Sequence, residues 1–97
     1  MQTKERMYVV VVELTNMIKA IAAAPKYGGF IQELKDDGKF VAAGKWSDNS
    51  GGMLILRADS IEGAREIAGE DPLIKSGAVQ HDVKEWDATF DFEPIEY

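Results

Sequence analysis

Apolar residues are most concentrated in the stretch Met7–Leu14, which is rich in β-branched and aromatic side chains and contains neither glycine nor proline. Such a composition is typical of a β-strand. Apolar side chains occupy both sets of alternating positions: Tyr8, Val10 and Val12 on one face, and Met7, Val9 and Val11 on the other. The pattern therefore predicts a central strand that is covered on both sides.

Helical periodicity follows this strand. Tyr27, Phe30, Ile31 and Leu34 recur at the spacing of a single helix face. Because proline is best tolerated in a first helical turn, we expect the main helix to begin near Pro25. We expect residues 15 and 16 to cap only a short helical turn before it, and Gly38 to end the main helix.

The rest of the chain alternates between strand and helix patterns. Residues 40–46 and 53–58 predict two strands joined by the turn-rich segment 47–52. Ser60 is expected to cap a second helix, which ends before Asp71-Pro72. Residues 73–77 are expected to form a short turn, and residues 78–86 the last strand.

The order strand, helix, strand, strand, helix, strand predicts an α+β fold, the ferredoxin-like β-α-β-β-α-β arrangement with an antiparallel sheet. Two helices can cover only one face of a four-stranded sheet. Since the first and third strands are apolar on both faces, the second face needs another cover. We expect a second copy of the chain there, giving a homodimer or a higher homo-oligomer.

Length and composition narrow the possible functions. The 97 residues are expected to form one domain, with a core over residues 7–87 and a tail over residues 88–97. The tail carries Phe90, Phe92, Ile95 and Tyr97, which we expect to dock on the sheet edge or on a neighbouring subunit. The absence of cysteine excludes thiolate metal sites, and the isolated acidic pairs are weak evidence for any metal site.

The net charge of −6 argues against a nucleic-acid partner, because there is no basic stripe to neutralise phosphates. There is no apolar run of the roughly 20 residues that a membrane-spanning helix requires. The first residues carry no apolar signal-peptide region, so we expect a cytoplasmic protein that acts without membrane contact.

Several segments resemble the YciI-like family in order and spacing. They are Leu34, Gly38, and the segments 40–44, 51–55, 58–60, 71–77 and 83–86. The resemblance covers roughly residues 7–87. It implies a dimeric α+β barrel, in which two ferredoxin-like sheets pack face to face around a cleft.

The resemblance also implies a catalytic pair, a histidine early in the first long helix and an aspartate in the Asp-Pro motif. Asp71 matches the aspartate, but Tyr27 stands at the histidine position. One protein of the family resembles a dehydrochlorinase of chlorinated hydroxyhydroquinones. A phenol, with a pKa near 10, is a poor base at neutral pH. The departure at Tyr27 therefore bears directly on whether this chain is an enzyme.

Each candidate residue has a structural and a functional interpretation. Asp71 either ends a helix or presents its carboxylate to the cleft. Tyr27 is either an aromatic residue of the cleft wall or a hydrogen-bond donor to a ligand. His81 is either a partly buried residue of the last strand or a group that titrates near neutral pH.

Trp46, Ser47 and Asp48 follow the second strand, where residues either form a turn or close over a small molecule. Two classes of function remain. One is a proton-transfer enzyme acting on a small, aromatic compound by elimination, dehydrochlorination or isomerisation, with Asp71 and His81 catalytic and no cofactor. The other is a non-catalytic ligand-binding or accessory dimer that has lost the histidine–aspartate pair.

Overall fold

The computed structural model describes residues 6–89. Its sheet has four antiparallel strands in the spatial order β2-β3-β1-β4. The strands are β1 (Arg6–Leu14), β2 (Phe40–Lys45), β3 (Gly51–Ala58) and β4 (Val79–Trp86). Together with the order of the helices, this arrangement is the ferredoxin-like α+β fold, as the sequence predicted. The tail residues Phe90, Phe92, Ile95 and Tyr97 lie outside the described residues.

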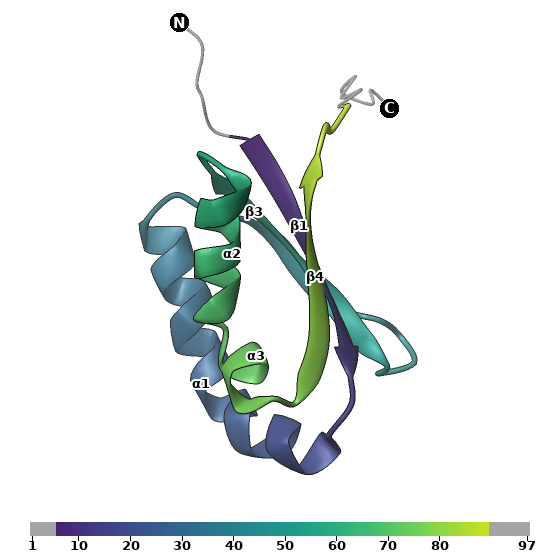
Figure 1. Ribbon diagram of the computed structural model, residues 1–97. Helices are drawn as coiled ribbons and strands as arrows, with labels where there is room; N and C mark the ends of the chain where they lie inside the picture. The colour runs from purple at the N-terminus through teal and green to yellow at the C-terminus, as the bar shows by residue number, and fades with distance from the viewer. Residues whose placement is uncertain (1–5, 90–97) are drawn as a thin grey trace, which may run out of the picture.

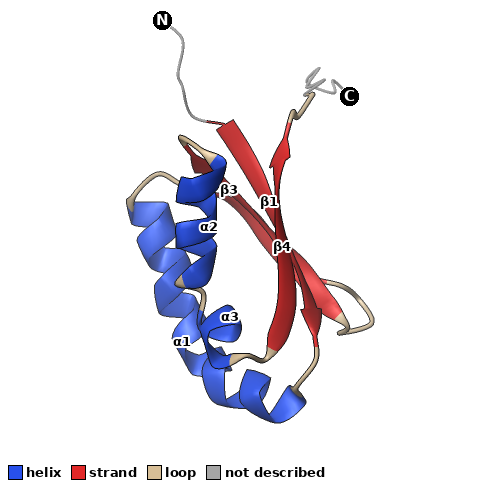
Figure 2. Cartoon of the chain, in the orientation of Figure 1, coloured by secondary structure: helices blue, strands red, loops and turns tan. Residues whose placement is uncertain are grey.

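Three helices cover one face of the sheet and leave the other face open (Figures 1 and 2). They are α1 (Met17–Asp36), α2 (Ile61–Gly69) and α3 (Pro72–Ser76). Among residues 6–89, no helix is long and apolar enough to cross a membrane.

The first helix begins well before the predicted position. Asn16 caps it, because its side-chain Oδ1 accepts a hydrogen bond of 3.0 Å from the backbone N–H of Lys19. Pro25 lies inside the helix, and the prediction that the main helix begins there was wrong. The alanine residues between positions 20 and 24 favour helix strongly enough to continue through the proline. The helix bends along its length (Figure 1), as a proline in a helix interior predicts.

The second half of the chain follows the predicted order with one refinement. Ser60 caps α2, since its Oγ accepts a hydrogen bond of 3.0 Å from the backbone N–H of Gly63. Residues 73–77, which the sequence predicted as a turn, contain most of the five-residue helix α3. Gly77 ends this helix with a positive φ of 78°, a conformation that glycine adopts without steric cost.

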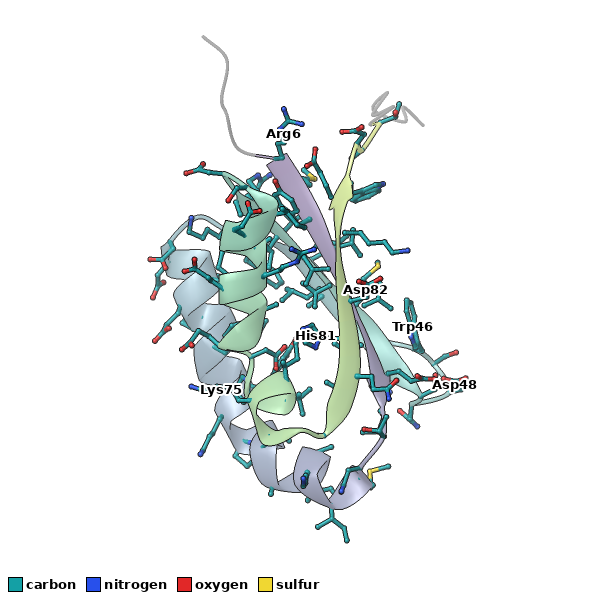
Figure 3. The ribbon with its side chains drawn as sticks, viewed as in Figure 1. Arg6, Trp46, Asp48, Lys75, His81 and Asp82 are labelled. Atoms are coloured by element: carbon teal, nitrogen blue, oxygen red, sulfur yellow. The ribbon has the colours of Figure 1, made fainter. Side chains whose placement is uncertain are left out.

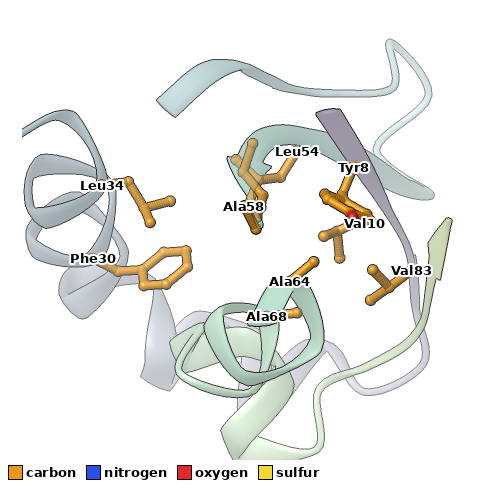
Figure 4. Close-up of a cluster of buried hydrophobic side chains, with 10 residues drawn as sticks. Tyr8, Val10, Phe30, Leu34, Leu54, Ala58, Ala64, Ala68 and Val83 are labelled. Atoms are coloured by element: carbon orange, nitrogen blue, oxygen red, sulfur yellow. The ribbon is translucent and has the colours of Figure 1, made fainter. Parts of the chain in front are cut away.

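The core lies between the sheet and the helices (Figure 4). Large side chains come from the strands and from α1, whereas α2 contributes alanines that let its backbone approach the sheet closely. The buried cluster comprises Tyr8, Val10, Phe30, Leu34, Leu54, Leu56, Ala58, Ala64, Ala68 and Val83.

The open face of the sheet is also apolar. Val9 and Val11 of β1 lie on it next to Met53 and Ile55 of β3. Ile55 is 8% exposed, whereas Val11 is 37% exposed. The two-faced character predicted for β1 is therefore present, and only one of its faces is covered within a single chain.

Because the core lies between the sheet and the helices, shortening a buried side chain should destabilise the protein much more than shortening an exposed one. Leu56 is fully buried, so Leu56→Ala should lower the free energy of unfolding by about 2–5 kcal/mol. Ile18 is 81% exposed, so Ile18→Ala should change the free energy of unfolding by no more than about 0.5 kcal/mol. Urea unfolding followed by circular dichroism measures both. Equal losses in the two variants would contradict the assignment of the core.

Candidate functional site

A cavity of about 540 Å³ lies between the helices and one end of the sheet. All four strands contribute to its lining, together with α1, the start of α3 and the β2–β3 hairpin. Most of the lining is apolar, and the side chains that make it so include Val12, Leu14, Met17, Ala20, Leu54, Leu73 and Val79. A cavity of this size and character suits a small organic molecule.

Gly52 allows the strands at this end of the sheet to approach closely. It pairs with Val12 of β1, on the side of the sheet that carries the core further along. A Cβ atom at position 52 would clash with the backbone carbonyl group of Gly44 in β2, so this position requires glycine. The cavity opens between this end of the sheet and the first segment of α1.

Asp71 is the buried carboxyl group of the cavity, with an exposed fraction of 3%. It precedes Pro72 at the start of α3, where it acts as the N-cap. Its Oδ1 accepts a hydrogen bond of 2.8 Å from the backbone N–H of Leu73. Asp71 therefore begins α3 and does not itself end a helix, since Glu70 is the C-cap of α2. The same residue also lines the cavity.

Burial determines the electrostatics of Asp71. Desolvation raises its pKa above the ordinary value, because the charged form loses its contact with water. Hydrogen bonds from the backbone of Leu73 and Ile74 and the electrostatic effect of His81 act in the opposite direction, but the net pKa shift is upward. A carboxyl group with a raised pKa is better matched to proton transfer near neutral pH than an exposed one.

Tyr27 lines the same cavity from α1. Its ring packs at 46° to that of Phe30, with 6.0 Å between the ring centroids, so the core holds it in position. Burial, followed by the negative charge of Asp71, raises the pKa of Tyr27 to about 12. The phenol therefore keeps its proton at neutral pH and can donate a hydrogen bond, but it cannot act as a base.

His81 lies on β4, opposite Val12 of β1 and on the same side of the sheet. Figure 3 shows its side chain on the side of β4 that faces the helices. It does not belong to the cavity lining, but its electrostatic effect reaches Asp71. The structure thus brings Tyr27, Asp71 and His81 to the same side of the sheet.

The other predicted residues lie elsewhere. Trp46, Ser47 and Asp48 form the β2–β3 turn and are absent from the cavity lining. Asp48 stabilises that turn, since its Oδ1 accepts hydrogen bonds from the backbone N–H and the Oγ of Ser50, at 2.9 Å and 2.6 Å. Trp46 and Asp48 are on the opposite side of the sheet from the helices (Figure 3). This placement supports the turn interpretation for these residues.

Sequence reasoning missed Lys45 and Asn49, which line the cavity from the hairpin. For Lys45, a β-bulge in β2 explains why alternation along the strand does not predict this position. Phe40 pairs with Leu56, but Ala42 pairs with Ile55, so the strand gains one residue between them. A one-residue shift exchanges the two faces of a strand. Without the bulge, strict alternation from Phe40 would direct position 46 toward the helices; with it, position 45 takes that direction.

No group of three or more histidine, aspartate and glutamate side chains is placed to hold a metal ion in the part of the chain that the structure describes. The functional groups that line the cavity include the carboxyl group of Asp71, the phenol of Tyr27 and the side chains of Lys45 and Asn49.

Comparison with known proteins identifies the family. Residues 7–87 match the YCII-related domain. The chain belongs to this family. The match confirms the YciI-like resemblance, which rested on the motifs between positions 34 and 86, and it spans every strand and helix described above except the first residue of β1.

Two individual proteins are similar to this member of the YCII-related family. The uncharacterized protein YjpA of Bacillus subtilis is 39% identical over 57 residues, which cover 59% of this chain and 67% of YjpA. A solved structure of a 5-chloro-2-hydroxyhydroquinone dehydrochlorinase from Burkholderia phenoliruptrix, in complex with 2,5-dihydroxybenzoquinone, superposes with a TM-score of 0.71. That likeness covers 86% of this chain and 95% of the dehydrochlorinase at 18% identity, so it shows a shared fold.

The raised pKa of Asp71 predicts an unusual pH dependence of stability. A group whose native pKa is raised contributes stability that is complete below its unfolded pKa of about 4 and is lost as the pH rises through the native value. Asp71→Asn removes the desolvated charge, and asparagine is an equally good N-cap. At pH 7 we expect the Tm of this variant to equal or exceed that of the wild type.

Near pH 4 the Tm of Asp71→Asn should fall relative to that of the wild type, because the wild-type carboxyl group is then protonated and its burial no longer costs stability. Thermal unfolding at both pH values measures the effect, and Asp59→Asn, at an exposed site, serves as the control. A loss of several degrees at pH 7 in Asp71→Asn alone would contradict the burial argument.

Proposed function

We propose that the chain is a small-molecule enzyme that binds an aromatic or similarly apolar compound in the cavity and transfers a proton through Asp71. The observation that carries this proposal is a desolvated carboxyl group with a raised pKa in the wall of an otherwise apolar cavity of about 540 Å³. A buried charge is costly, and such groups with perturbed pKa values concentrate at functional sites.

The fitting reaction class is elimination, dehydrochlorination or isomerisation. In an elimination, the ionised Asp71 would accept a proton from carbon, the electrons of the C–H bond would form a double bond, and the leaving group would depart with its bonding pair. The Tyr27 hydroxyl would donate a hydrogen bond to an oxygen of the substrate. His81 would act through Asp71, whose pKa it lowers and whose ionised form it therefore favours.

The fold of the dehydrochlorinase supports a ligand of this class. Its structure contains 2,5-dihydroxybenzoquinone, a single six-membered ring with hydroxyl and carbonyl oxygens. A ring of this size fits within the cavity volume of the present chain. We therefore take 2,5-dihydroxybenzoquinone as the first probe for this cavity.

A second candidate is a ligand-binding or accessory protein without catalytic activity. The observation that favours it is the pKa of Tyr27, about 12, at the position where the family resemblance implies a histidine. The phenol cannot take over the role of an imidazole base, so Asp71 would have to transfer the proton without one.

Mutation of the two cavity residues tests the enzymatic proposal. Hydroxylated and halogenated aromatics, beginning with 2,5-dihydroxybenzoquinone, would be screened by thermal shift, and binders assayed for turnover. We expect Asp71→Asn to lower kcat on the order of a hundredfold. Tyr27→Phe should lower it far less, because only a hydrogen bond is lost, and Tyr27→His should raise it.

Asp59→Asn is again the matched control and should leave kcat unchanged. Binding without turnover in the wild type and in every variant would favour the accessory protein. Turnover that is undiminished in Asp71→Asn would contradict the role of Asp71.

We further propose that the chain forms a homodimer, or a higher homo-oligomer, through the open face of the sheet. The register places Val9, Val11 and Trp86 on this face, and Trp46 lies on the same side (Figure 3). Trp46 and Trp86 are each 41% exposed. Exposed apolar patches of this kind mark interaction surfaces, and the face-to-face barrel of the YciI-like resemblance would cover this one.

A charge on the open face tests the assembly. We expect the wild type to sediment as at least a dimer at micromolar concentration. Val11→Asp should shift it to the monomer, because burying an unpaired carboxylate costs several kcal/mol. Ile18→Asp, on the outer side of α1, is the control and should keep the wild-type sedimentation coefficient. A monomeric wild type would refute the proposed interface.

A further inference from the structure

Lys45 is the cationic side chain among the described residues that line the cavity, and Asp71 is the anionic one. The remaining lining is neutral and mostly apolar. The chain as a whole carries a net charge of −6, whereas the charged side chains of the cavity lining are one lysine and one aspartate.

The backbone fixes the direction of Lys45. It is the last residue of β2 and pairs with Gly52 of β3, which in turn pairs with Val12 of β1. Directly paired residues share a face of the sheet. Lys45 therefore leaves the sheet on the helix side, next to a glycine that has no side chain to obstruct it.

Asn49 orients the ammonium group. The Nζ of Lys45 donates a hydrogen bond of 2.8 Å to Oδ1 of Asn49, and Asn49 also lines the cavity. Asn49 has a positive φ of 64°, a conformation that asparagine tolerates better than most residues. An ammonium group has three N–H donors, and this bond uses one of them.

Lys45 and Asp71 lie toward opposite walls of the cavity. Lys45 belongs to β2, at one edge of the sheet, whereas Asp71 interacts electrostatically with His81 on β4, at the other edge. Adjacent strands are about 4.8 Å apart, so these two edge strands are separated by roughly 14 Å. An apolar surface made by Val12 and Leu54 of the two central strands lies between them.

We propose that Lys45, oriented by Asn49, binds an oxyanion of the ligand, a carboxylate or a phenolate. This inference rests on the proposed function of the cavity and specifies its substrate class: an organic anion with an apolar body. The anionic group lies at the β2–β3 hairpin and the reacting carbon lies near Asp71. The opposite orientation would bring two negative charges together at a desolvated site, which is costly.

A pair of probes that differ only in charge tests this inference. 2-Naphthoate and 2-naphthamide have the same fused ring and nearly the same shape, but only the first is anionic at pH 7. We expect wild-type protein to bind 2-naphthoate about fivefold more tightly, as a charge-assisted hydrogen bond in a partly exposed site predicts. Isothermal titration gives both affinities, and methyl shifts of Val12 and Leu54 in NMR spectra show that each probe occupies the cavity.

Three variants separate the charge of Lys45 from its other effects. Lys45→Met keeps the length of the side chain and should abolish the preference for 2-naphthoate while leaving the affinity for 2-naphthamide nearly unchanged. Lys45→Arg keeps the charge and should retain most of the preference. Lys26→Met removes an exposed lysine of α1 that is not part of this cavity, and it should retain the whole preference.

The outcomes distinguish this inference from the proposal on which it rests. Binding of both probes in the cavity with equal affinity, or a preference that survives in Lys45→Met, would overturn the role of Lys45 and leave the cavity as a ligand site. Equal weakening of both probes in Lys45→Met would show a purely structural role and would also overturn it. Failure of either probe to shift the methyl resonances of the cavity would overturn the small-molecule site itself, and the inference with it.

Discussion

Strand β1 is hydrogen-bonded on both edges, to β3 and to β4, and this double pairing fixes which side chains face the helices. Tyr8 and Val10 enter the core, and Val12, further along the same face, reaches the cavity. The cavity thus continues the core along the same face of the sheet, toward the β2–β3 hairpin. The register of the sheet therefore sets which strand residues line it.

The same pairing explains why one carboxyl group is desolvated. Asp71 connects α2 to α3 on the side of the sheet that the helices cover, so the layer that buries the core also removes water from Asp71. The backbone N–H of Leu73 compensates part of this cost by a hydrogen bond, as it would at any helix N-terminus. The remaining cost appears as the raised pKa. Local helix capping and the electrostatic character of the cavity therefore depend on one side chain.

Sequence patterns predicted those features of the fold that depend on residues close together in the chain. Composition and spacing directly predicted three features: the two apolar faces of Met7–Leu14, the cap at Ser60 and the order of the six main elements. The start of α1 was mispredicted, since the breaking effect of Pro25 was given more weight than the helix-forming alanines before it. Tyr27, Asp71 and His81 remain candidates, and their location on one side of the sheet depends on tertiary packing that local patterns do not encode.

The hairpin shows where sequence reasoning reaches its limit. A β-bulge leaves no reliable trace in residues 40–42, yet it decides which residue of the hairpin points toward the helices. The bulge also accommodates a difference in length within β2. If the extra residue were deleted, strict alternation would return between Phe40 and Lys45, and Lys45 would keep its pairing with Gly52 on the helix side. The hairpin end of the cavity wall is therefore unaffected by a one-residue deletion at the start of β2.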